Sequence, residues 1–225
     1  PFDVPEVIYD ASPNVLLITL DTCREDRIGC YGFTLARTKA IDALAEDGVR
    51  CTNAVAAAPI TLPSHSTILT GLLPPAHGVR DNGAYALSDD ALTLAERLKA
   101  ANYSTHAVVS AEVLNRRYNL TQGFDEYIDD LWEEEAPATF MIRDRPAQKT
   151  AKLVRESLER WNEQSAEKPK PFFMWMHLFD PHQPWVADIP DKHLAPTPYD
   201  AEIGQADDGV ESVIEWLREQ GILDN

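Results

Sequence analysis

Three short polar segments carry the side chains in this sequence that could do chemistry. Asp21 closes the apolar run Val15–Leu20, where a carboxylate could hold a hard cation through oxygen. Thr61 comes just before a proline-started helical pattern, where unpaired backbone N–H groups and the helix dipole favour a negatively charged oxygen. His182 lies between two prolines that predict an extended, outward-pointing exit, and it could protonate a leaving group. These residue types suit attack of a hydroxyl on an anionic ester.

Each of these residues also has an ordinary structural interpretation. Asp21 could cap a helix or bond within a loop, and Thr61 could serve only as a helix N-cap. His182 could be a structural loop histidine. The local sequence leaves both interpretations open at all three positions.

The segments that must position these side chains alternate between strand-like and helix-like patterns. Continuous apolar runs at Val15–Leu20 and at residues 172–179 (FFMWMHLF) predict buried parallel strands. The pattern also predicts strands at residues 49–55 and 105–109, and helices at 39–46, 64–69, 91–101, 150–161 and 210–217. This alternation predicts an α/β fold: a mostly parallel central sheet with helices on both faces, in one domain over residues 1–225. Ligands gather at the carboxyl ends of such strands, where Asp21 and His182 fall.

The charge of the chain excludes several classes of partner. Its 225 residues carry a formal net charge of -17, which repels nucleic-acid phosphates and anionic membranes. No apolar run approaches the roughly 20 residues of a membrane helix, and residues 1–12 lack the pattern of a signal peptide. We therefore expect no nucleic-acid or membrane partner. An anionic substrate would need a locally positive pocket, and a bound divalent cation is the simplest way to make one.

The cysteine pattern points to no covalent framework. Cys23, Cys30 and Cys51 cannot all pair, and no Cys-x-x-Cys motif is present. We expect these three side chains to be small, buried and apolar.

Taken together, these segments resemble the N-terminal part of the sulfatase family, in the alkaline phosphatase superfamily. The stretch from Asp21-Thr22 to Gly29-Cys30-Tyr31-Gly32 is similar to that family's opening metal motif. Residues 59–71 are similar to its nucleophile segment, whose hallmark is Cys or Ser, any residue, Pro, any residue, Arg. Residues 177–185 resemble its Pro-His-x-Pro element, and residues 77–83 and 199–210 resemble neighbouring segments. The resemblance covers about residues 13–225 and implies an alkaline phosphatase/sulfatase-like fold.

The resemblance implies a metal site and a nucleophile. Asp21 would be a metal ligand, Thr22 would occupy a second ligand position, and Thr61 would be both nucleophile and ligand. The implied cofactor is one divalent ion: calcium, manganese, magnesium or zinc.

The resemblance also implies residues that contact the substrate. Asn82 would reach a non-bridging oxygen of the sulfuryl or phosphoryl group, and His182 would contact the ester. His65 takes the place of the family's arginine, and Arg80 would supply part of the missing positive charge.

The sequence departs from the family pattern in two places. Thr61 and His65 replace the Cys and Arg needed for conversion to formylglycine, so no formylglycine is expected. Related branches use an unmodified threonine on phosphate esters or phosphonates, which favours a phospho-transfer variant. The family's later Asp-His-Gly or Asp-Asn metal motif is absent, so we expect a chain truncated at its C-terminus with an incomplete metal cage.

The sequence therefore favours a metal-dependent hydrolase or transferase of sulfate or phosphate esters, with Thr61 as nucleophile and a small anionic ester as substrate. The alternative is a catalytically inactive sulfatase-like fragment or anion-binding domain. The resemblance favours a periplasmic or extracellular location, and the sequence leaves the oligomeric state open.

Overall fold

In the computed structural model, residues 12–131, 144–165, 170–185 and 195–223 are described. Their strands form one four-stranded sheet in the order β1-β4-β2-β3. The strands are β1 (Val15–Leu20), β2 (Ser104–Val108), β3 (Glu126–Ile128) and β4 (Phe172–Leu178). Every neighbouring pair is parallel, so the carboxyl ends of the strands meet at one edge of the sheet. The prediction of a mostly parallel sheet is confirmed.

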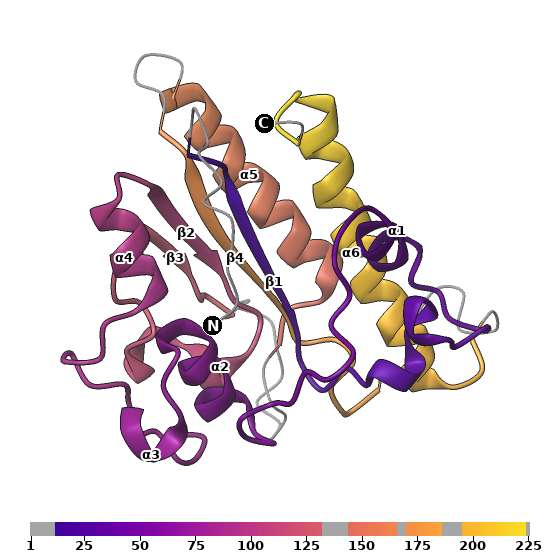
Figure 1. Cartoon of the computed structure of the whole chain (residues 1–225), viewed down its shortest axis with the longest axis horizontal. Coiled ribbons are helices and arrows are strands. Elements are labelled where there is room, and N and C mark those ends of the chain that lie inside the picture. The colour runs from indigo at the N-terminus through magenta and orange to yellow at the C-terminus, as the bar shows by residue number, and fades with distance from the viewer. Residues whose placement is uncertain (1–11, 132–143, 166–169, 186–194, 224–225) are drawn as a thin grey trace, which may run out of the picture.

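Helices cover both faces of this sheet (Figure 1). One face carries α2 (Thr61–Thr70), α3 (Pro74–His77) and α4 (Leu94–Ala100), and the other carries α5 (Ala147–Ser165) and α6 (Pro198–Glu219). Helix α1 (Lys39–Asp47) packs against α6, and short 3₁₀ turns lie at Glu25–Arg27, Gly29–Tyr31, Glu112–Leu114 and Arg116–Tyr118. No helix in these described ranges is long and apolar enough to cross a membrane.

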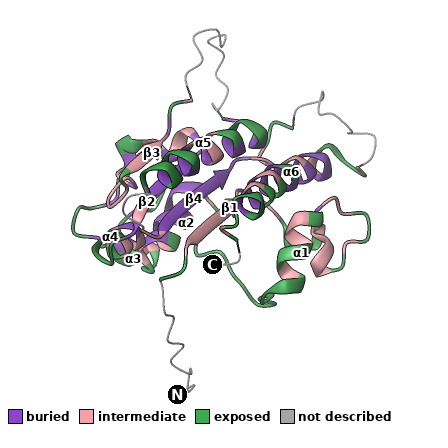
Figure 2. Cartoon of the chain, turned by 90° about the horizontal axis from the view of Figure 1, so that it is seen from above, coloured by how far each residue is buried: buried purple, intermediate pink, exposed green. Residues whose placement is uncertain are grey.

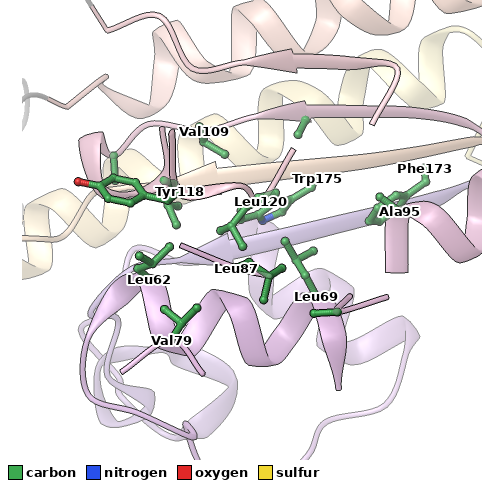
Figure 3. Close-up of a cluster of buried hydrophobic side chains, with 14 of the residues drawn as sticks. Leu62, Leu69, Val79, Leu87, Ala95, Val109, Tyr118, Leu120, Phe173 and Trp175 are labelled. Carbon is green, nitrogen blue, oxygen red and sulfur yellow. The ribbon is translucent and has the colours of Figure 1, made fainter. Parts of the chain in front are cut away.

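Strand β4 is the centre of the core. All seven of its residues are buried, and the strand lies between the two helical layers (Figure 2). Side chains alternate between the faces of a strand. Phe173 and Trp175 therefore pack with Leu62 and Leu69 of α2 (Figure 3), while Met174 and its neighbours on the opposite face pack against α5 and α6. This double burial explains why the strand reads as a continuous apolar run.

One predicted strand is wrong, and one strand was not predicted. Residues 49–55 form no strand, and Val49 and Val55 are 92% and 91% exposed. A short apolar alternation is stable as a strand only beside a pairing partner. The sheet instead extends to β3, which pairs with β2 over three residues and is too short to leave a periodic pattern.

Helix α6 begins at Pro198, well before the predicted residues 210–217. Thr197 caps its first turn by accepting the Asp200 N–H, and proline suits the first helical position. Gly204 and Gly209 weaken the helical pattern inside it. The Gly209 position lies so close to Ala147 of α5 that an added Cβ would meet the Ala147 Cβ at 3.1 Å, so close packing of the two helices explains this glycine.

The prediction that all three cysteines are buried is wrong. Cys51 is exposed, whereas Cys23 and Cys30 are half-buried, and all three are free thiols. Burial raises the pKa of the Cys23 thiol to about 12, so this sulfur stays protonated and is a poor nucleophile.

Candidate active site

Thr61 and Asp21 meet at the carboxyl edge of the sheet. The Thr61 hydroxyl donates a hydrogen bond to Asp21 Oδ2 at 2.8 Å, and the two residues are 6% and 9% exposed. Helix α2 begins at Thr61 itself, after Ile60 in an extended conformation. The Thr61 side chain therefore binds Asp21 and does not cap the helix, so the N-cap interpretation is wrong.

Asn82 caps α2 from a distant loop. Its Oδ1 accepts the backbone N–H of Leu62 at 2.9 Å. Because the carbonyl oxygen takes this bond, the Asn82 amide keeps its N–H donors for another partner. Pro63 has no N–H, so the start of the helix offers a bound anion fewer backbone donors than the sequence suggested.

A cavity of about 440 Å³ opens beside Thr61. This volume lies within the usual range of small-molecule sites. All the predicted site residues except Arg80 line it: Asp21, Thr22, Thr61, His65, Asn82 and His182. Arg80 is exposed and lies outside this lining, so it is not placed to supply positive charge to the cavity.

His65 is a buried, neutral imidazole. Its Nδ1 lies 2.8 Å from the Thr61 carbonyl oxygen, which makes Nδ1 the donor, and its ring packs 4.8 Å from the His177 ring. Burial lowers the pKa of His65 to about 4. A neutral imidazole at pH 7 cannot provide the positive charge of the arginine that it replaces.

The depressed pKa of His65 predicts a loss of stability in acid. The unfolded chain protonates this group near pH 6.5 and the folded chain only near pH 4, so stability falls as pH drops through that window. We expect the free energy of unfolding to fall by about 2 kcal/mol at pH 5 through this group. Urea titrations of wild type and His65→Gln between pH 7 and pH 4 measure it.

The difference between the two titration curves isolates His65. Burial raises the pKa of Asp180 and Asp207 to about 6, and their contribution has the opposite sign because it is lost as pH rises. Both carboxyls are present in each protein, so they cancel. Parallel curves for wild type and His65→Gln would refute the assignment.

Asp21 is held in its ionised form. Burial alone would raise its pKa, but the contacts with His177 and the Thr61 hydroxyl hold that pKa below its ordinary value. The site therefore presents a carboxylate to the Thr61 hydroxyl throughout the neutral pH range.

His182 lies in a turn and not in the extended exit that the prolines predicted. Its backbone N–H bonds to the Phe179 carbonyl at 2.9 Å, and both X–Pro bonds beside it, Asp180–Pro181 and Gln183–Pro184, are cis. The ring stacks on Phe179 with centroids 4.3 Å apart. Nδ1 lies 2.6 Å from the Gln183 carbonyl oxygen, so Nδ1 donates and Nε2 is the nitrogen left to serve the cavity.

The described residues fit only part of a divalent cation site. Asp21 and Thr61 offer the oxygen ligands that hard cations prefer, and the exposed Thr22 follows directly. Calcium needs about six to eight oxygen ligands, and magnesium about six. Within the described ranges, no three His, Cys, Asp or Glu side chains gather as a metal cluster. The type of donor therefore suits a hard cation, but these residues alone are too few to complete its coordination.

Asn82 offers a test that separates its two roles. We expect Asn82→Ala to destabilise the fold by about 1 kcal/mol, because α2 loses its cap, and to weaken binding of inorganic phosphate or sulfate. Asn82→Asp keeps the capping oxygen and loses the N–H donors. It should therefore retain stability but bind the anions more weakly. Denaturation and calorimetric titration measure the two effects, and anion binding by Asn82→Asp as tight as wild type would contradict the donor role.

The chain is similar to known proteins in both sequence and fold. A family model described as Sulfatase matches residues 13–225. An N-acetylglucosamine-6-O-sulfatase from Bacteroides thetaiotaomicron is 28% identical over 193 residues, covering 77% of this chain and 31% of the relative. The crystal structure of Ps i-CgsB in complex with k-i-k-neocarrahexaose superposes with a TM-score of 0.78 at 21% identity, covering 96% of this chain and 57% of that one. The phosphonate monoester hydrolase of Agrobacterium radiobacter gives 0.74 at 18% identity, covering 95% and 60%. The chain thus spans about a third of that curated relative and under two thirds of either structure.

Proposed function

The chain belongs to the sulfatase family, and from this premise we propose that it hydrolyses or transfers sulfate or phosphate esters with Thr61 as the nucleophile. The observation that carries the proposal is the hydrogen bond from the Thr61 hydroxyl to Asp21. It joins a nucleophile at the start of a helix to a carboxylate at the end of a strand, inside a cavity that also contains Asn82 and His182. A nucleophile bonded to an acceptor is the minimum arrangement for covalent catalysis.

In the first step, Thr61 Oγ1 attacks the sulfur or phosphorus in line with the leaving oxygen. A bond forms from Thr61 to the transferred group, and the bond to the leaving oxygen breaks. Asp21 accepts the hydroxyl proton late, because a carboxylate with a lowered pKa is a weak base but can take a proton as charge develops. The N–H donors of Asn82 would bind a non-bridging oxygen of the group in transfer.

In this step His182 would be an imidazolium, with Nδ1–H bonded to the Gln183 carbonyl, and would give its Nε2 proton to the leaving oxygen, so the alcohol departs neutral and a neutral imidazole remains. Water then attacks the Thr61 ester, regenerates the hydroxyl and releases sulfate or phosphate. His182 Nε2 takes the proton that this water loses, and Asp21 returns its proton to Thr61 Oγ1, so both groups regain their starting forms. His65 bonds to the Thr61 carbonyl and would hold the first turn of α2 in place.

A divalent ion is part of the proposal. Asp21, Thr22 and Thr61 would be this chain's share of its ligands, for calcium, manganese, magnesium or zinc. When bound, the ion would supply the positive charge that is provided neither by the neutral His65 nor by Arg80, which lies outside the cavity lining.

The residue at position 61 favours phosphate over sulfate chemistry. Threonine is a secondary alcohol, so its oxidation cannot give the aldehyde from which formylglycine chemistry proceeds. The structural similarity to a phosphonate monoester hydrolase supports the same direction, although that similarity establishes the fold alone.

A second cavity of about 480 Å³ would take the organic group of the ester. Thr22 and His182 line both cavities, so this one adjoins the proposed reaction centre. The rings of Trp185 and Tyr199 stand 5.7 Å apart in its wall. Trp185 Nε1 bonds to the Pro181 carbonyl and the Tyr199 hydroxyl to the Thr22 carbonyl, so both polar ends are satisfied and the ring faces are left for contact.

Trp185 should therefore increase kcat/KM only for esters of large alcohols. We expect Trp185→Ala to lower kcat/KM about fivefold for a benzyl ester, as an aromatic contact of about 1 kcal/mol implies, and to leave the methyl ester unchanged. Trp185→Phe keeps a ring face and should lie close to wild type. Equal losses on benzyl and methyl esters would contradict this placement.

Assays of the protein on an aryl phosphate, a phosphodiester and a sulfate ester, with added manganese, zinc or calcium, test the main proposal. Quenched reactions should yield a Thr61 peptide that carries one phosphoryl or sulfuryl group, detected by peptide mass spectrometry. Turnover with the covalent group on another residue would refute the role of Thr61.

The partial metal site favours one alternative, an inactive sulfatase-like domain that binds anions. In that case the protein shows no turnover with any of the three ester types and binds none of the three metals in calorimetric titration. Phosphate or sulfate binding without turnover would support the alternative.

A further inference from the structure

His177 lies directly behind the Thr61–Asp21 pair. It belongs to β4, is fully buried, and faces the α2 side of the sheet with Trp175. Its Nε2 lies 3.8 Å from Asp21 Oδ2, the same oxygen that accepts the Thr61 hydroxyl. On its other side, Nδ1 lies 3.4 Å from the Ser110 backbone nitrogen and 3.2 Å from the Ser110 hydroxyl oxygen.

Ser110 fixes which nitrogen of His177 carries the proton. The Ser110 backbone N–H can only donate, and it points at Nδ1. A hydrogen on Nδ1 would collide with that N–H, so Nδ1 is the acceptor and Nε2 carries the hydrogen. The Ser110 hydroxyl also donates to the His177 carbonyl, which ties the serine to the backbone of β4.

The Nε2–H group therefore points toward a carboxylate from inside the core. Nε2 is buried and makes no hydrogen bond within the described residues. A buried N–H without a partner is unfavourable and uncommon in folded proteins, so its position calls for an explanation. The distance of 3.8 Å is too long for a hydrogen bond, but catalytic hydrogen bonds are often long before substrate binds.

We propose that His177 is a positioning residue that acts on Thr61 through Asp21, with Ser110 holding its tautomer. Its Nε2–H orients Asp21 Oδ2 toward the Thr61 hydroxyl. The distance from Nε2 to Oδ2 shortens to a hydrogen bond when the nucleophile is aligned for attack. The His65 ring packs edge-on against His177 at 4.8 Å and limits its rotation. The role in catalysis rests on the proposed function of Thr61, whereas the tautomer follows from the backbone N–H of Ser110, which can only donate to Nδ1.

Two substitutions test the roles of the two ring nitrogens of His177 one at a time. Asparagine places its amide where Nδ1 was, so His177→Asn keeps the acceptor for Ser110 but does not reach Asp21. Glutamine reaches the position of Nε2, so His177→Gln restores a donor toward Asp21. We expect His177→Asn to lower kcat by about 10- to 100-fold with little change in KM, and His177→Gln to recover most of that loss.

Nitrogen-15 spectra of the wild-type histidines test the tautomer without any assay. The protonated and unprotonated ring nitrogens have distinct shifts, and His177 should appear as the Nε2–H form. A Nδ1–H form would overturn the inference even if the variants do not fold. So would equal kcat values for His177→Asn and wild type. If the spectra show Nε2–H but Thr61→Ala retains full turnover, the proposed function fails while the tautomer assignment stands.

Discussion

Thr61→Ala is expected to lower the turnover of sulfate and phosphate esters by at least about 10³-fold, because the attacking oxygen is lost. The fold should persist, since the substitution removes one hydrogen bond, to Asp21, with a net cost of about 1 kcal/mol. Alanine is also a good helix former at the start of α2. Steady-state rates and denaturant titration of the same preparation measure both effects.

Two controls define this experiment. Thr61→Ser keeps a hydroxyl at the same position and should retain most of the activity. Thr67→Ala removes a threonine from the same helix, where the hydroxyl contacts His77 and not the cavity, and should leave turnover unchanged. Activity in Thr61→Ala equal to that of Thr67→Ala would show that the nucleophile lies elsewhere.

The sequence could predict the residues at strand ends because buried parallel strands leave a readable pattern. The runs that form β1 and β4 are continuous and apolar, and Asp21 and the segment of His182 follow them directly. Once the sheet is parallel, those ends must share an edge. The topology places Asp21 at this edge of the sheet, whereas the family resemblance was needed to place Thr61 beside it.

The contacts that complete the site could not be predicted, because they join residues far apart in the chain. Asn82 caps α2 from a loop 20 positions away from Leu62, and Ser110 contacts His177 across 67 positions. His177 also sits inside an apolar run, where its sequence context suggests packing alone. A local pattern records which residues are buried, but it does not record which polar atoms meet in the core.

The charge of the site also could not be predicted from the sequence. The sequence suggested that His65 and Arg80 together replace a missing arginine, but burial makes His65 neutral and exposure leaves Arg80 outside the cavity. Protonation depends on the surroundings of a side chain and not on its type. The cavity therefore needs a cation or a charged donor from elsewhere to bind an anion.

Asp21→Asn is the second substitution with a large expected effect. Asparagine has the same shape, but it carries no charge and cannot accept the proton of Thr61. We expect kcat to fall by about 10³-fold or more, comparable to the loss when a buried catalytic aspartate becomes an amide. Rates under saturating substrate measure this change, and circular dichroism verifies that the fold is kept.

The pH dependence of the same pair separates proton acceptance from packing. Contact with His177 and Thr61 holds the pKa of Asp21 below its ordinary value of 3.8, so the stability from the ionised form is present above that pH and is lost as pH falls through the lower folded pKa. Asp21 should therefore not titrate in the wild-type rate profile above about pH 4. If wild-type activity instead fell as pH rose toward neutral pH, and Asp21→Asn abolished that fall, the active form would carry a protonated Asp21 with a raised pKa. Asp21 would then act as a proton donor in the resting enzyme, and the direction of proton transfer proposed for Thr61 would be wrong.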